Sequence, residues 1–151
     1  MIYTYDVLGR VIKKEFPLLS GQIERSAVRA VYDCENRTVT VIDVLGHYAV
    51  QQFDKLGRLT RIDVYSGSYP SGTLYASKTY SYRYDDSVSQ VTDLGNHTTT
   101  YTYDFLGRYI QITLPGSFVS YSYDDTTNKI VYTDGRGYDK TCWFSWSGEL
   151  T

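Results

Sequence analysis

Carboxylates and imidazoles are the side chains of this chain whose types and spacing could do chemistry. Two pairs of adjacent carboxylates occur, Asp85/Asp86 and Asp124/Asp125. A glycosidase needs two carboxyl groups roughly 5–10 Å apart on either side of one sugar. Adjacent residues of a strand point to opposite faces of the sheet. The two pairs are therefore interpreted as structural residues, not as a catalytic acid and base.

The two histidines lie at matching positions. His47 and His97 each follow an aspartate by four residues, Asp43 and Asp93, so we expect them to occupy equivalent sites in a repeat. A metal ion would need both imidazoles at one point, together with further ligands. Neighbouring strands lie about 4.8 Å apart, and a repeat of two or more strands would separate the histidines by more than that. We expect surface residues here, not metal ligands.

Other signs of chemistry are weak. Cys34 and Cys142 have no metal-binding spacing, and we do not expect them to form a disulfide within the chain. No serine lies in a G-x-S-x-G elbow. The Gly-rich stretch from Asp134, "DGRGYDKT", lacks the Gly-Lys-Ser/Thr ending of a phosphate loop. The sequence therefore predicts no enzyme activity, no metal and no cofactor.

A repeated string accounts for the aspartates. Strong copies are "YDVLGR" from Tyr5, "FDKLGR" from Phe53 and "YDFLGR" from Tyr103. Weaker copies start at Tyr32, Tyr84, Tyr123, Asp43, Asp93, Asp134 and, near the end of the chain, Trp146. Recurrence at a fixed period indicates a repeat architecture, here with a unit of about 20 residues.

The repeated string has a mechanical explanation. In "Y-x-Y" the two aromatic side chains share one face of a strand. In "D-x-x-G" the carboxylate accepts a backbone N–H two residues on, and Gly supplies a positive φ. Arg then begins the returning strand of a hairpin. The tyrosine pairs expected to share a face are Tyr3/Tyr5, Tyr82/Tyr84, Tyr101/Tyr103 and Tyr121/Tyr123.

These signals predict an all-β fold of antiparallel hairpins laid side by side in an extended sheet or open β-solenoid. The 17 tyrosines favour strands, and we expect one array over residues 1–151. Helix-like spacing occurs in "SGQIERSAVRAVYD" from Ser20, which we interpret as loop and strand, with a helix as the alternative. The Ser-, Gly- and Pro-containing stretch from Tyr65 to Lys78 is expected to be an exposed loop.

The bulk properties exclude several classes of function. A net charge of -2 gives no basic surface for nucleic acid. No stretch approaches the roughly 18–20 apolar residues of a membrane span. No signal peptide is recognised, and we interpret the chain as a piece of a longer protein.

The strings "YTYDVLGR" from Tyr3 and "YTYDFLGR" from Tyr101 resemble the YD repeat, also called the RHS repeat. This family includes bacterial Rhs polymorphic toxins, the B and C subunits of insecticidal Tc toxin complexes, wall-associated surface proteins and teneurins. The resemblance implies a long β-sheet that spirals into a hollow shell, which in toxin members encloses a cytotoxic C-terminal domain. It implies framework roles for Tyr3, Tyr5, Asp6, Gly9, Arg10, Phe53, Asp54, Gly57, Arg58, Tyr101, Tyr103, Asp104, Gly107 and Arg108.

In those roles Tyr would stack on Tyr of the next turn, Asp would brace its hairpin and Arg would meet acidic neighbours. Phe53 departs from the pattern, and the aspartate self-cleavage motif of many toxin shells is absent from the sequence. We expect a non-catalytic wall segment of a secreted or cell-surface protein. A glycan- or protein-binding module in adhesion is the alternative. Expected partners are neighbouring repeats of the parent chain and an enclosed toxin domain, and other copies of the chain through exposed sheet edges.

Overall fold

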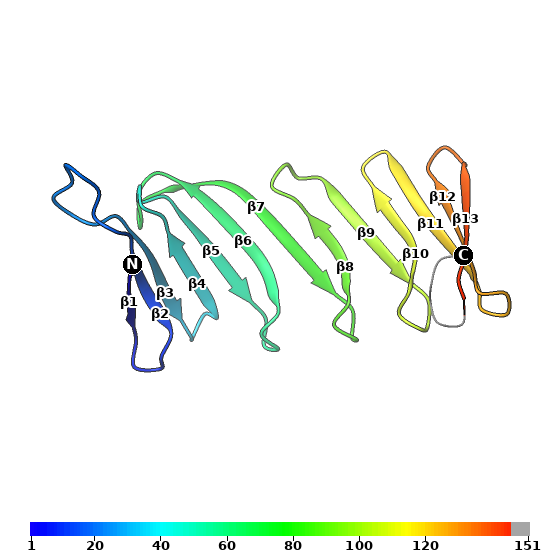
Figure 1. Ribbon diagram of the computed structural model, residues 1–151, viewed down its shortest axis with the longest axis horizontal. Coiled ribbons are helices and arrows are strands. Elements are labelled where there is room, and N and C mark those ends of the chain that lie inside the picture. Colours follow the sequence, from blue (N-terminus) through cyan, green and yellow to red (C-terminus); the bar gives the residue numbers. More distant parts are fainter. Residues whose placement is uncertain (146–151) are drawn as a thin grey trace. The chain divides into compact units, whose positions relative to one another are not determined.

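The computed structural model describes residues 1–145, and every regular element in them is a β-strand (Figure 1). The strands are β1 (Ile2–Tyr5), β2 (Val11–Glu15), β3 (Ala27–Asp33), β4 (Thr38–Ile42), β5 (Tyr48–Phe53), β6 (Leu59–Ser66), β7 (Thr73–Tyr82), β8 (Val88–Thr92), β9 (Thr98–Tyr103), β10 (Tyr109–Leu114), β11 (Ser117–Asp124), β12 (Lys129–Asp134) and β13 (Asp139–Trp143). The predicted all-β class is confirmed. The weak repeat copy from Trp146 lies outside the described residues.

The strands form open antiparallel sheet in sequence order. The chain divides into two compact units, Met1–Thr79 and Tyr80–Thr151, with β7 crossing from one to the other. In the first unit each strand from β1 to β7 is antiparallel to the next, and the second unit repeats this from β8 to β13. That all residues form one array stays a prediction.

The structure shows which residues are loop and which are strand in two segments that were ambiguous from the sequence. Residues 20–26 contain no helix and Ala27–Asp33 is strand β3, which confirms loop and strand there. The predicted loop from Tyr65 to Lys78 was too long. Pairing continues through Tyr65 opposite Leu74, so the loop shrinks to residues 67–72, where Gly, Ser and Pro gather. At both ends of this stretch, pairing between β6 and β7 extends the strands into residues whose composition is typical of a loop.

The two faces of the second unit differ in chemistry. Directly opposed residues share a face, so Tyr101, Ile112 and Val119 lie together on one side of β9, β10 and β11. Thr102 and Gln111 oppose each other on the other face, and both are exposed. The period-two pattern of the sequence therefore separates an aromatic and aliphatic face from a polar one.

Burial is sparse. Within residues 1–145 the buried side chains are Ile42, Tyr48 and Thr40. A single layer of sheet leaves both faces accessible, so each side chain is covered chiefly by its neighbours on adjacent strands. Contacts between neighbouring hairpins must therefore supply most of the stabilisation that a hydrophobic core supplies in a layered domain.

The best-covered site lies under the loop of residues 67–72. The Tyr48 ring stacks on Tyr65 at 4.6 Å between centroids and meets the Tyr69 ring edge-on at 5.2 Å. The Tyr48 hydroxyl donates to the Pro70 carbonyl at 3.2 Å. A Cβ on Gly72 would lie 2.8 Å from the Tyr48 ring, so the approach of this loop requires glycine.

We therefore expect Tyr48→Ala to lower the free energy of unfolding by about 3 kcal/mol, because it empties the site between Tyr65 and the loop. Tyr75→Ala is the matched control, since the Tyr75 side chain is 78% exposed. Urea unfolding followed by circular dichroism measures both variants. Equal destabilisation of the two would contradict a local core at Tyr48.

Candidate functional site

The strongest constellation in the structure is a five-residue turn braced by one carboxylate. In the turn between β1 and β2, Asp6 Oδ1 accepts the backbone N–H groups of Leu8 and Arg10, each at 2.9 Å. Asp6 Oδ2 accepts Arg10 Nε at 2.7 Å. Gly9 closes the turn with a φ of 76°, and its N–H donates to the Asp6 carbonyl at 3.0 Å. One carboxylate thus binds both the backbone and the arginine.

The same geometry recurs in the two other strong copies. Asp54 accepts Leu56 N–H, Arg58 N–H and Arg58 Nε at 2.8, 3.0 and 2.7 Å. Asp104 does the same with Leu106 and Arg108, at 2.9, 2.9 and 2.7 Å. Gly57 and Gly107 have φ values of 80° and 79°. The structure places these residues of the repeat in equivalent turns.

The histidines occupy the arginine position of turns at the other ends of the strands. Asp43 Oδ1 accepts His47 N–H at 2.9 Å, and His47 Nδ1 lies 3.3 Å from Asp43 Oδ2. His97 N–H likewise donates to Asp93 Oδ1 at 2.9 Å, with Nδ1 at 3.4 Å from this oxygen. Over residues 1–145, no group of three His, Cys, Asp or Glu side chains could hold a metal ion. The two histidines are turn residues.

The weak repeat copy predicted to start at Tyr84, with Asp85 as its turn aspartate, was placed two residues too late in the sequence. Arg83 takes the place of the turn aspartate: its N–H donates to the Ser87 carbonyl at 2.8 Å, and its carbonyl accepts Asp86 N–H at 3.3 Å. Tyr84 lies in the turn and is 93% exposed, so it does not share a strand face with the preceding tyrosine. Arg83 pairs with Asp85, two residues further on in the same turn, at 3.3 Å.

The two carboxylate pairs were expected to lie on strands, with their side chains on opposite faces, and this was wrong. Asp85 and Asp86 lie in a turn, and Asp125 follows the end of β11, so neither pair alternates along a strand. Asp124 instead accepts the hydroxyls of Thr126 and Thr127. Asp125 binds Arg108 Nη1 at 2.6 Å and Nη2 at 3.2 Å.

Arg10 also contacts the next hairpin along the same row of strand ends. The guanidinium of Arg10 lies 4.2 Å from the centroid of the Tyr32 ring. The Tyr32 hydroxyl donates to the Val11 carbonyl at 3.1 Å, one residue after that arginine. Arg10 therefore holds its own turn through Asp6 and the following hairpin through Tyr32.

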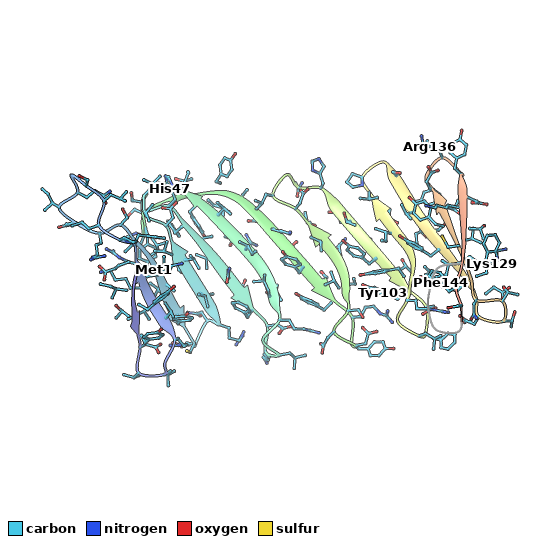
Figure 2. All side chains as sticks on the ribbon, in the orientation of Figure 1. Met1, His47, Tyr103, Lys129, Arg136 and Phe144 are labelled. Atoms are coloured by element: carbon cyan, nitrogen blue, oxygen red, sulfur yellow. The ribbon has the colours of Figure 1, made fainter. Side chains whose placement is uncertain are left out.

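This junction recurs twice in the second unit, at the strand ends near Tyr103 in Figure 2. Arg83 lies 4.8 Å from the Tyr103 ring, whose hydroxyl donates to the Val88 carbonyl at 2.7 Å. Arg108 lies 4.1 Å from the Tyr123 ring, whose hydroxyl donates to the Tyr109 carbonyl at 2.8 Å. This bond was not predicted from the sequence. The tyrosine before each turn was the available signal.

Tyrosine rings also meet across neighbouring strands. Tyr109 lies 4.8 Å from Tyr103 and 5.7 Å from Tyr101. The resemblance to YD repeats predicts that tyrosine stacks on the tyrosine of the next turn. At the three junctions, an arginine lies over the turn tyrosine. At Phe53, which has no hydroxyl, the backbone N–H donates to the Arg37 carbonyl at 2.9 Å, and Arg37 Nε donates to the Phe53 carbonyl at 3.3 Å.

Hydrogen bonding shifts the pKa values of these groups. The backbone N–H of the turn arginine lowers the pKa of Asp6 and of Asp54. Partial burial raises the pKa of Asp104, but the hydrogen bonds from Arg108 outweigh it and the pKa falls. Hydroxyl donors lower the pKa of Asp124 to about 2. Burial, followed by the Tyr109 hydroxyl, raises the pKa of Tyr103 to about 12.

The largest cavity described in the first unit has walls of mixed charge. It holds about 560 Å³ between the loop of residues 16–26 and the turn after β4, beside Arg25, Arg29 and Asp43. Lys13 and Glu15 at its wall already pair at 3.0 Å. Both thiols, of Cys34 and Cys142, are free. No helix among residues 1–145 is long and apolar enough to cross a membrane.

Comparison with known proteins gives a distant relative. No protein-family model matches the chain. The chain is 28% identical over 155 residues to the tRNA3(Ser)-specific nuclease WapA of Bacillus spizizenii. This match covers 98% of the chain but 6% of the nuclease, so the chain spans a small fraction of the length of its relative. The chain is thus similar to a short segment of a protein named as a nuclease, and its place among YD-repeat proteins stays a prediction.

Acid should unfold the protein in a window set by the turn carboxylates. Their folded pKa values lie below the ordinary value, so they stabilise the fold above about pH 4. This stability should be lost as the pH falls from about 4 towards the pKa of about 2 of Asp124. Urea midpoints between pH 7 and 2 test this. Asp104→Asn should flatten the profile, and an unchanged profile would contradict the assignment.

Arg108→Lys should lower Tm by several degrees, because lysine cannot reproduce the planar contacts with Asp104, Asp125 and Tyr123. Arg136→Lys is the control. Arg136 pairs with Asp134 inside its turn at 2.8 Å, and its side chain is 79% exposed. Differential scanning calorimetry should show the larger loss for Arg108→Lys. Equal losses would mean that the contact with the next hairpin adds nothing.

Proposed function

We propose that this chain is a non-catalytic structural segment of a longer YD-repeat protein, where it forms part of the wall of a shell that encloses a toxin domain. The observation that carries the proposal is the junction itself. At three places an arginine covers the tyrosine of the following hairpin, and that tyrosine donates to the preceding strand. Side chains that could have met a ligand are used to join hairpins, as in proteins whose repeats contact mainly their neighbours.

The extent of the relative supports a segment of a long protein. The match runs along nearly all of this chain and a small part of the nuclease. We assign no nuclease step to this segment, because its net charge of -2 gives no basic surface for phosphates. Neighbouring repeats of the parent chain and an enclosed toxin domain are the partners we propose. The repeat motif further supports a secreted or cell-surface location.

Glycan binding is the second candidate, supported by the cluster of Tyr101, Tyr103 and Tyr109. Tyr109 is 42% exposed and could stack on a sugar. The geometry of Tyr103 argues against it, because Arg83 lies over this ring and the hydroxyl is bonded to Val88. We therefore favour packing over recognition for this cluster.

A glycan array tests the choice, with the wild-type chain, a Tyr101→Ala/Tyr103→Ala double variant and Tyr75→Ala as an exposed-tyrosine control. A wall segment should bind no glycan, should not cleave total tRNA, and should lose cooperative unfolding in the double variant. Truncating the two half-buried tyrosines should cost about 3 kcal/mol or more. Glycan binding that disappears in a double variant which still folds would replace the wall with a recognition surface.

A further inference from the structure

We propose that the outer edge of β1 is a docking site for a β-hairpin whose turn carries an arginine at its first or last position, with the second strand of that hairpin paired to β1. This inference rests on the proposed structural function and specifies the partner of one surface. Strand β1 shares its Tyr-Thr-Tyr sequence with β9, whose outer side is paired with another strand.

Strand β1 and strand β9 begin equivalent hairpins. Both carry Tyr-Thr-Tyr followed by Asp, Leu-Gly and Arg. Tyr5 pairs with Val11 across a one-residue irregularity, and Tyr103 pairs with Tyr109 across the same irregularity. The internal geometry of the two hairpins therefore matches, and what surrounds β9 indicates what β1 can accept.

The far side of β9 is filled by β8. Gln90, Val91 and Thr92 pair with the first residues of β9. Next to the turn, Tyr103 donates to the Val88 carbonyl and lies under Arg83. The corresponding side of β1 pairs with no strand among residues 1–145. Tyr5 is 56% exposed, and within the described part of the chain its hydroxyl makes no hydrogen bond.

The three filled junctions define the chemistry that a strand docked on β1 should carry. Each supplies a backbone carbonyl just after its turn, from Val11, Val88 or Tyr109. Each also supplies an arginine over the tyrosine ring. Arg10 and Arg108 stand at the last position of their turns, and Arg83 stands at the first. The residues that give the carbonyl differ, because any backbone can accept the bond. Arginine is common to all three, so it is what distinguishes a fitting hairpin from any other strand.

The edge of β1 is also open to pairing. Its four residues, Ile2 to Tyr5, are all exposed and include neither a charged residue nor proline. Natural sheet edges are commonly protected by such residues. Backbone pairing along β1 would give affinity, and the Tyr5 contact would select a turn that carries arginine.

The test uses the whole chain and a synthetic peptide copied from residues 98–114, cyclised head to tail to hold its hairpin. Hydrogen exchange reports whether the β1 amides become protected, and fluorescence anisotropy of a labelled peptide gives Kd. We expect protection of β1. Tyr5→Phe should weaken binding about five-fold through loss of one hydrogen bond. Arg→Gln in the peptide, at the position of Arg108, should weaken it about three-fold or more through loss of the cation–π contact.

Tyr75→Phe is the matched protein control and should bind as the wild type does. No protection of β1, or equal affinity for the wild-type chain, Tyr5→Phe and the arginine-free peptide, would overturn the proposal. Protection of β1 by self-association that the peptide does not displace would also overturn it. None of these results alters the glycan-array outcome, so failure of the docking site and failure of the wall function are distinguishable.

Discussion

The structure depends on an arginine that binds in two directions at once. In a single layer of sheet, almost no side chain is buried and hydrophobic burial alone cannot hold one hairpin against the next. Arg10, Arg83 and Arg108 join neighbouring hairpins, because each pairs with a carboxylate of its own turn and covers a tyrosine of the following hairpin. The planar guanidinium suits this double role, since it can donate along its edge while its face lies on a ring.

The turns differ in sequence but keep the same backbone hydrogen bonds. Asn96 adopts the left-handed conformation that glycine holds elsewhere, with a φ of 62°. Arg83 takes the aspartate position of its turn and pairs with Asp85. Histidine takes the arginine position at His47 and His97 and keeps the backbone bond to the turn aspartate. What is preserved along the chain is a set of contacts, and several residue types satisfy it.

Much of this could be predicted from the sequence. Period-two tyrosines and Asp-x-x-Gly turns are local signals, and they placed the hairpins of Asp6, Asp54 and Asp104. The limits of the loop after β6 depended on pairing between Tyr65 and Leu74, which no local composition reveals. The copy near Tyr84 was displaced because a Tyr-Asp pair resembles the motif. Only the hydrogen bonds of Arg83 show where that turn begins. The tyrosine-to-carbonyl bond was missed because it joins residues on different hairpins.

The junction has a direction. In each described case the tyrosine belongs to the later hairpin, and the carbonyl and arginine to the earlier one. A ribosome releases the earlier hairpin first. Each new hairpin therefore leaves the ribosome with its acceptor already made, and growth of the sheet can keep pace with translation. A chain assembled in this order need not expose long unpaired strands at any stage, which suits a protein that repeats one motif many times.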